Sequence, residues 1–176
     1  MLSFWEDVFL GPGDGPHILR VVARLSIACL LGAAIGLERF GEGKSAGLRT
    51  HMLVALGAAM FTLIPIEAAM NTGDVSRVIQ GVAAGIGFLG AGTILKLEEK
   101  HRIKGLTSAA SVWLTAAIGT AAGAGWIWLA IIGMIWGMII LYLLHKFEQK
   151  ELGKIEGKGA PGQKEPGQEG KKKDLE

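Results

Sequence analysis

Cysteine is almost absent from this sequence, which has only Cys29 among its 176 residues. A lone cysteine cannot form an internal disulfide, and a zinc site would then depend on histidines. The four histidines are His17, His51, His101 and His145, and no two of them have the short spacing of a zinc-binding helix. The sequence also lacks a nucleophile elbow and a Walker loop. We therefore expect that the protein is not an enzyme and that it has no catalytic, cofactor-binding or metal-ligating residues.

Charged residues are scarce as well, at 19% of the chain, whereas half of the residues are hydrophobic and the mean hydropathy is +0.40. This balance is unusual for a water-soluble domain. A helix needs ~20 mostly apolar residues to cross a bilayer. Five stretches have about this length: residues 19–37, 52–70, 78–95, 106–124 and 126–144. Because backbone groups in lipid must satisfy their own hydrogen bonds, we predict an all-α polytopic membrane bundle with five transmembrane helices.

Lysine and arginine are unevenly distributed among the segments that join these stretches. Residues 1–19 contain neither, the first joining segment contains Arg39, Lys44 and Arg49, and the second contains only Arg77. The third segment is basic again, the fourth has no charge, and the end of the chain is rich in lysine. Because basic loops stay in the cytoplasm, the pattern predicts an N-terminus outside and a C-terminus inside.

These features divide the chain into three parts. Residues 1–18 are predicted to form an extracytoplasmic segment, and residues 19–145 the transmembrane domain. Residues 146–176 mix glycine, proline, glutamine, lysine and glutamate without apolar periodicity. Such a segment cannot bury enough surface to offset the entropy of ordering, so we expect a disordered cytoplasmic tail.

Glycine is abundant, with 27 residues. The string GIGFLGAG at 85–92 has the glycine spacing of a dinucleotide-binding loop, but it lies within the apolar stretch 78–95, without the strand and helix start that such a loop requires. In lipid, small residues four apart allow helices to approach closely. We interpret the following as helix-packing residues: Gly32, Gly36, Gly81, Gly85, Gly87, Gly90 and Gly92. The alternative is a helix that breaks here and lines a cavity with free carbonyls.

An internal repeat relates the first four stretches. A shift of 58 positions aligns Leu31, Gly32 and Ala33 with Leu89, Gly90 and Ala91, and it aligns Gly47-Leu48 with Gly105-Leu106. The first two helices would form a hairpin that the next two repeat in the same sense, with the fifth helix added. Two equivalent loops would then lie side by side in the cytoplasm.

Polar residues gather in these two loops. Each loop ends in Gly-Leu at the start of a helix, where free backbone N–H groups and nearby cations suit an anion or a lipid phosphate. The alternative is that the polar residues cap helices and fix the topology. The candidates are Glu38, Arg39, Arg49, Thr50 and Thr107. Because Glu38 and Arg39 adjoin the membrane boundary, we expect them to pair with cations of the second loop.

A second polar set is predicted on the outer side. Arg20 and Arg24 lie on one helix face, and Glu67, Asp74 and Arg77 follow near the second and third helices. They can neutralise each other across the hairpin. Alternatively, Glu67 and Asp74 form a mouth that attracts cations, and one or two carboxylates would suffice for Mg²⁺ without requiring it.

Three extended motifs together resemble one protein family. They are GLERF followed by KSAGLRTHMLVALGAAMF, then RVIQGVAAGIGFLGAGTIL, and then IKGLTSAASVWLTAAIGTAAGAG. Over about residues 22–145 the sequence resembles the membrane domain of the MgtC/SapB family. The matching positions are Gly36, Glu38, Arg39, Gly47, Leu48, Arg49 and Thr50, then Arg77, Gly85, Gly87, Phe88, Leu89, Gly90, Ala91 and Gly92, and finally Gly105, Leu106, Thr107, Ala109, Ala110 and Trp113. Ser108 stands where a threonine is common.

The resemblance implies a multi-pass protein of the bacterial inner (cytoplasmic) membrane that is linked to growth in low magnesium. In some pathogens the family is linked to survival inside macrophages, and some members are linked to inhibition of the membrane ATP synthase. The virulence-factor members carry a soluble C-terminal domain where this sequence has its Gly/Lys/Glu tail. This difference argues against the virulence role and leaves the membrane domain as the expected functional unit.

Two hypotheses of function follow. The first is a non-enzymatic regulator of magnesium homeostasis that uses its glycine-lined faces to bind a second copy or another membrane protein, such as the membrane ATP synthase that the resemblance suggests. The second is a small transporter or channel for Mg²⁺ or another cation, based on the repeat, Glu38 and Glu67. Neither involves nucleic acid, and both place the chain in a lipid bilayer.

Overall fold

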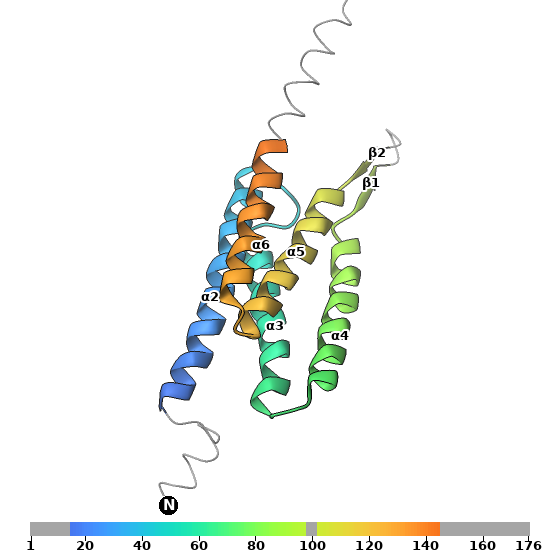
Figure 1. Cartoon of the computed structure of the whole chain (residues 1–176). Coiled ribbons are helices and arrows are strands. Elements are labelled where there is room, and N and C mark those ends of the chain that lie inside the picture. Colours follow the sequence, from blue (N-terminus) through green and yellow to red (C-terminus); the bar gives the residue numbers. More distant parts are fainter. Residues whose placement is uncertain (1–14, 98–101, 145–176) are drawn as a thin grey trace, which may run out of the picture. The chain divides into compact units, whose positions relative to one another are not determined.

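The computed structural model describes residues 15–97 and 102–144 (Figure 1). Its helices are α2 (Gly15–Gly41), α3 (Leu48–Glu67), α4 (Thr72–Ala91), α5 (Leu106–Gly123) and α6 (Ile127–Ile139), followed by a π-helical turn, η2 (Ile140–Leu144). The prediction of a helical fold is thereby confirmed. The first compact unit of the chain ends at Met138, and η2 belongs to the second. The predicted outer segment and the predicted tail lie largely outside the described residues.

A short hairpin is added to the helical fold. Strands β1 (Leu95–Leu97) and β2 (Arg102–Lys104) pair antiparallel, with Leu95 opposite Lys104. The third apolar stretch was expected to remain helical to Leu95, but α4 ends at Ala91 and is capped by Gly92. The apolar residues that follow are used in strand pairing, a difference that hydropathy alone does not reveal.

Within residues 15–97 and 102–144, three helices are long and apolar enough to cross a membrane, namely α2, α3 and α5. Residues 127–143 form a shorter apolar helical segment. In α4, the first two turns carry the charged residues Asp74 and Arg77. The five α-helices of the described ranges match the five predicted stretches, while length and composition identify three of them as candidate spans.

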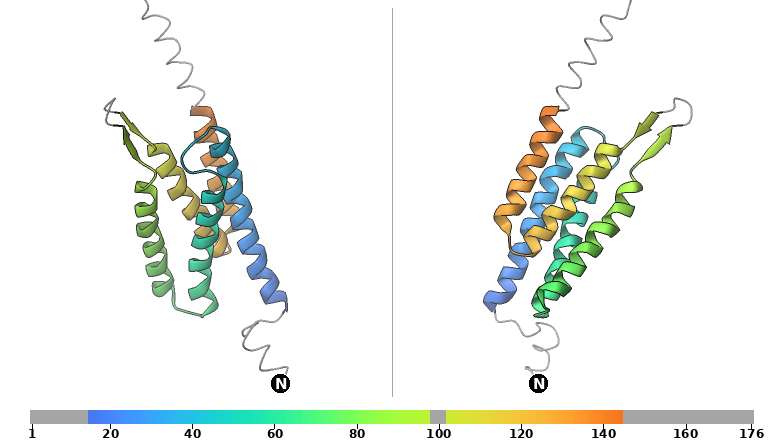
Figure 2. Two further views of the ribbon diagram at one scale, coloured as in Figure 1. Left: turned by 180° about the vertical axis from the view of Figure 1, so that it is seen from behind. Right: turned by 45° about the vertical axis from the view of Figure 1, so that its right-hand side comes forward.

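The four longer helices pack as two outer and two inner ones. The inner helices α3 and α5 contact each other, and both outer helices, α2 and α4, contact both of them (Figures 1 and 2). This is the contact pattern that two repeated hairpins would produce. Both inner helices begin after a glycine, Gly47 for α3 and Gly105 for α5. Gly105 has φ +99°, and a Cβ there would lie 2.0 Å from the Thr93 carbonyl oxygen, so this position requires glycine.

Glycines bring α2, α3 and α5 together at backbone distance. A Cβ on Gly32 would lie 2.6 Å from the His51 carbonyl oxygen, and one on Gly36 would lie 2.7 Å from Leu48 Cα. On the other side of α3, a Cβ on Gly119 would lie 2.2 Å from the Ala55 carbonyl oxygen. The core between these helices accordingly consists of small residues and lacks room for larger ones.

Helix α4 packs less closely than α2, and most residues of α4 are exposed. No neighbouring atom in the described structure lies within 4 Å of a Cβ built on Gly81, Gly85 or Gly87. Only Gly90 is buried among the residues of α4, and a Cβ there would lie 3.4 Å from the Ala109 carbonyl oxygen. Gly92 meets the carbonyl of Leu89 in its own chain segment. Within the unit, the packing role expected of the α4 glycines is therefore seen at Gly90 alone.

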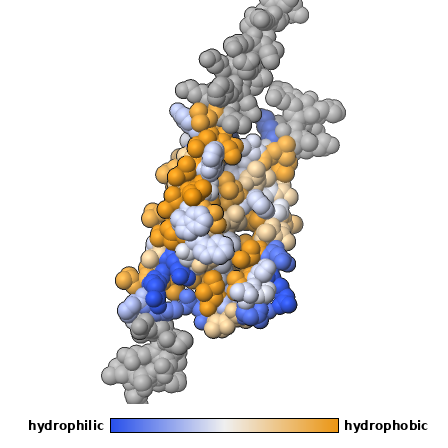
Figure 3. All heavy atoms as spheres, in the orientation of Figure 1, coloured by the Kyte–Doolittle hydropathy of each residue, from blue (hydrophilic) through white to orange (hydrophobic). Residues whose placement is uncertain are grey.

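The outside of the helical unit is largely apolar. Many large hydrophobic side chains are exposed, including Leu30, Trp128 and Phe88, the last at 87%. Apolar residues cover much of the visible face, while polar ones gather where α2 and α4 begin (Figure 3). An exposed apolar surface of this extent is typical of a protein that faces lipid.

Candidate functional site

A buried polar cluster joins three helices at the end of the unit where α2 ends and α3 and α5 begin, which we call the Arg39 end. Arg39 in the last turn of α2 is 2% exposed, and its Nη2 donates to Ser108 Oγ in α5 at 3.5 Å. His51 of α3 is fully buried, and Ser111 of α5 lies beside it. The cluster thus cross-links α2, α3 and α5 by polar contacts where their backbones are already close.

His51 has a complete set of hydrogen-bond partners in either protonation state. Its Nδ1 lies 2.9 Å from the Gly47 carbonyl oxygen and must donate to it. Its Nε2 lies 3.2 Å from Ser111 Oγ, which is also 2.9 Å from the Ser108 carbonyl oxygen. The serine hydroxyl has one proton, so it donates to a neutral His51, and it donates to Ser108 when Nε2 itself carries a proton. No heavy atom has to move between these states.

Two carboxylates lie near the Arg39 guanidinium. Arg39 Nη1 lies 3.8 Å from Glu38 Oε2 and 3.7 Å from Glu42 Oε2, and Lys44 Nζ lies 3.4 Å from the same Glu42 oxygen. The expected partners of Glu38 and Arg39 were cations of the second loop, of which residues 98–101 lie outside the described structure. Within the described part, Arg39 instead pairs with Glu38 of its own helix and with Glu42, which directly follows the helix. A buried charge of this kind requires such compensation.

At the opposite end, which we call the Glu67 end, the residues of the predicted outer set make separate contacts rather than one cluster of ion pairs. Glu67 contacts His17 of α2, whereas Arg24 donates to the Gly123 carbonyl oxygen at 3.4 Å. Across the hairpin, Glu67 therefore contacts His17 in place of the expected arginines, and neither Arg20 nor Arg24 forms an ion pair among the described residues.

Asp74 belongs to the start of α4. It contacts Arg77 one turn later, and its backbone N–H donates to the Asn71 side chain at 3.1 Å as part of the N-terminal cap. The contacts of Asp74 are thus with Asn71 and Arg77, whereas Glu67 contacts His17. Among the described residues, no group of three His, Cys, Asp or Glu side chains is placed to hold a metal ion.

The remaining candidate polar residues lie in the first turns of the inner helices. Arg49 and Thr107 are exposed and Thr50 is half-buried. Arg49 forms no ion pair with any residue in the described ranges. The sequence reading missed the buried role of His51 and Ser111. The sequence did contain a sign of this role, because His51 and Ser111 lie on helix faces that otherwise carry small residues, such as Ala55 and Thr115.

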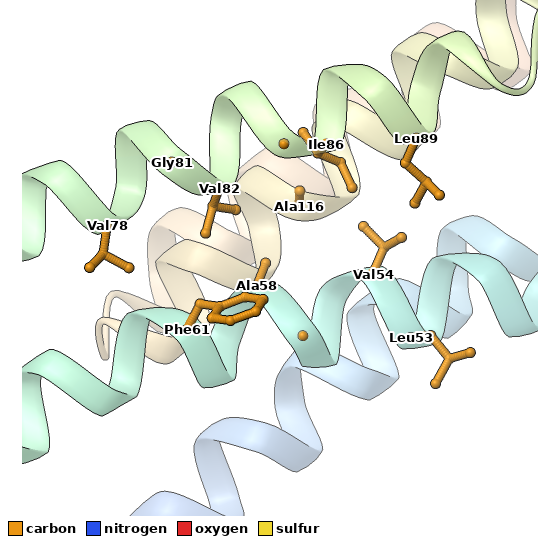
Figure 4. A pocket seen from close by; sticks show the side chains of 12 residues that line it. Leu53, Val54, Ala58, Phe61, Val78, Gly81, Val82, Ile86, Leu89 and Ala116 are labelled. Carbon is orange, nitrogen blue, oxygen red and sulfur yellow. The ribbon is translucent and has the colours of Figure 1, made fainter.

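Two apolar grooves flank α4. The first lies between α3 and α4 with Ala116 of α5 at its base, and it has a volume of about 680 Å³ (Figure 4). The second, of about 750 Å³, lies between α4 and α5 and also includes Trp126 and Leu129 at its edge. Helix α4 is therefore held to the unit by a narrow contact with open space on both sides.

Comparison with known proteins agrees with the sequence motifs. A model of the MgtC family matches residues 25–150. The chain belongs to the MgtC family. The matched region contains the Arg39 cluster, all of α3, α4 and α5, and both grooves.

Several relatives cover most of this chain. Protein SrpB of Synechococcus elongatus is 44% identical over 147 residues, which are 76% of this chain and 78% of SrpB. YhiD of Escherichia coli strain K12, whose name proposes that it transports magnesium, is 38% identical over 76% of this chain and 64% of YhiD. Protein MgtC of Brucella abortus strain 2308 is 40% identical over 75% of this chain and 54% of its own length. No solved structure matches the chain.

Proposed function

We propose that this chain is a multi-pass protein of the bacterial inner membrane that regulates magnesium homeostasis and adaptation to low magnesium without being an enzyme. It would act by binding a second copy or another membrane protein, for which the family resemblance suggests the membrane ATP synthase. The observation that carries this proposal is the contrast between the closed packing of α2, α3 and α5 and the open packing of α4.

The contact surface that we propose is the outward face of α4. Ala84, Gly87 and Ala91 are three and four residues apart, so they lie on one side of the helix, and all three are exposed. Apart from the backbone of α4 itself, no atom of the described structure lies within 4 Å of a Cβ on Gly87. In a bilayer, helices associate mainly where small residues allow close backbone contact. This face supplies such a surface to a partner helix.

Five spans with the N-terminus outside form part of the proposal. The α2–α3 loop and the β1–β2 hairpin lie at the same end of the unit (Figure 1). The α2–α3 loop has Lys44, Arg49 directly follows it, and β2 ends in Lys104. The positive-inside rule would put this end in the cytoplasm.

A transporter is the second candidate function, and the buried charges at the Arg39 end favour it, together with the name of YhiD. The interior of a single copy argues against a path along the bundle. Beyond the buried cluster, the backbone of α3 is in close contact with α2 at Gly32 and with α5 at Gly119 and Gly123. An ion would have to cross between copies or move α4.

Flux and cross-linking measurements together test the proposal. We expect protein reconstituted in liposomes to pass no more Mg²⁺ than empty liposomes. With Cys29 replaced by serine, a single cysteine at Ala84 should cross-link to the partner in native membranes, and Gly87→Leu should abolish this cross-link. A cysteine at exposed Leu30 of α2 is the matched control. Mg²⁺ flux that disappears in Arg39→Gln would refute the regulator and support the transporter.

A further inference from the structure

The groove between α3 and α4 has a uniform chemistry. Every residue that lines it is apolar or glycine, and the side chains in view consist of carbon (Figure 4). Val82 and Ile86 of α4 pack against the core and close the inner side. Leu53 and Phe61 of α3 are exposed at its outer edge, so the groove opens sideways from the unit.

Glycines create the space. Gly57 of α3 and Gly81 and Gly85 of α4 line the groove, and apart from the backbone of its own helix no described atom lies within 4 Å of a Cβ on any of them. A larger residue at any of these positions would reduce the space without meeting backbone. The groove therefore exists because these positions of α3 and α4 are glycines, although the two helices contact each other elsewhere.

The length of the groove matches one acyl chain of a lipid. It extends along α4 from Val78 to Leu89, which is about 16 Å at ~1.5 Å per residue. This is about half of the ~30 Å hydrocarbon thickness of a bilayer, and so the depth of one leaflet. The groove is lined by hydrocarbon side chains and glycines, which suits an acyl chain of this length.

A cation lies beyond one end of the groove. Arg49 is four residues before Leu53, so both are on the same side of α3, and Arg49 is about 6 Å further toward the Arg39 end. Arg49 is exposed and has no ion-pair partner among the described residues. A guanidinium binds phosphate oxygens by paired, charge-assisted hydrogen bonds.

From this arrangement we infer that the α3–α4 groove is a phospholipid site, in which one acyl chain lies against Gly57, Gly81 and Gly85 and Arg49 holds the phosphate. The lipid belongs to the leaflet at the Arg39 end. Its tail replaces the helix side chains that the glycines omit, and it fills the space that separates α4 from α3. The inference is independent of whether the protein is a regulator or a transporter.

Photolabelling with a defined lipid tests the inference. The full chain is reconstituted in phosphatidylethanolamine vesicles doped with phosphatidylglycerol that carries a diazirine in mid-chain, and labelled peptides are mapped. We expect labelling concentrated in residues 53–61 and 78–89, in excess over the exposed face of α6. The double variant Gly81→Leu/Gly85→Leu should lower labelling of these segments roughly tenfold, as expected for the loss of a site worth about 1.4 kcal/mol.

Two matched variants separate the parts of the site. Gly87→Leu, on the outward face of α4, should leave groove labelling unchanged. Arg49→Gln should lower labelling by the phospholipid roughly tenfold, yet leave unchanged the labelling by an uncharged diazirine alkane, which has no phosphate to lose. Arg49→Lys should restore part of the phospholipid signal. Equal melting temperatures of all variants in detergent show that the fold is intact.

Several results would overturn the inference. Labelling spread evenly over all exposed helices, or unaffected by the double leucine variant, would mean that the protein contacts only bulk lipid. Protein-to-protein cross-links from the groove in place of lipid adducts would assign it to a second copy. Equal effects of Arg49→Gln on both probes would remove the phosphate contact from the site.

Discussion

Replacing Gly119 by alanine is the most direct test of the closed packing between α3 and α5. The added Cβ would lie 2.2 Å from the Ala55 carbonyl oxygen and 2.8 Å from Ala55 Cα. Both atoms belong to the backbone of α3, so no side-chain rotation can relieve the contact, and the two helices must separate. Overpacking of this kind destabilises by ~1–3 kcal/mol, while alanine regains up to about 1 kcal/mol of helix propensity. We expect a net loss of about 1–2 kcal/mol.

Gly81→Ala is the matched control, because it makes the same chemical change on a helix where the Cβ meets no atom within 4 Å among the described residues. The overpacking penalty is then absent, and stability should be unchanged or up to about 1 kcal/mol higher. Both variants are purified in the same detergent and unfolded by denaturant, with helicity followed by circular dichroism. If Gly119→Ala proved as stable as Gly81→Ala, the backbone contact between α3 and α5 would be wrong.

Two further predictions concern the buried polar cluster. Arg39→Gln removes the buried cation beside Glu38 and Glu42 and should lower the free energy of unfolding by about 2–3 kcal/mol, whereas Arg77→Gln, which removes an exposed pair, should change it by less than about 1 kcal/mol. Equal effects would show that the cluster is solvated. Ser111→Ala removes the hydroxyl beside His51 Nε2 and should lower the free energy of unfolding by about 1–2 kcal/mol in the same denaturant titration. No loss would mean that the imidazole finds another partner.

Hydropathy and glycine punctuation predict most of the fold. The predicted starts of the two inner helices follow from Gly47 and Gly105, and the structure has α3 and α5 beginning at the next residue. The β1–β2 hairpin was not predictable in this way, because Leu95 and Leu97 satisfy a helical and a strand pattern equally well over so short a run. Hydrophobic period and composition describe one element at a time, whereas strand pairing depends on the sequences of both strands.

The candidate site was less predictable than the fold. Spacing identified Gly32 and Gly36 as close-packing residues as readily as it identified Gly81 and Gly85, but only the first pair meets backbone in the structure. Glycine spacing shows that a helix face allows close approach of another helix, but which helix packs there depends on the tertiary structure. The same limit applies to Glu67, whose contact with His17 depends on where α2 begins relative to the end of α3.

The two proposals for α4 concern different sides of one helix and can be separated for that reason. Gly87 lies two residues beyond Gly85, which turns it about 200° around the helix, away from the α3–α4 groove. A leucine at Gly87 therefore affects a partner helix on the outward face, whereas leucines at Gly81 and Gly85 fill the groove. The lipid could position α4 for its partner simply by acting as a spacer between α3 and α4. The variant Gly81→Leu/Gly85→Leu should then show low lipid labelling but unchanged, high cross-linking to the partner, because the leucine side chains replace the acyl chain. If lipid labelling and cross-linking both fall in this variant, the position of α4 requires the lipid itself.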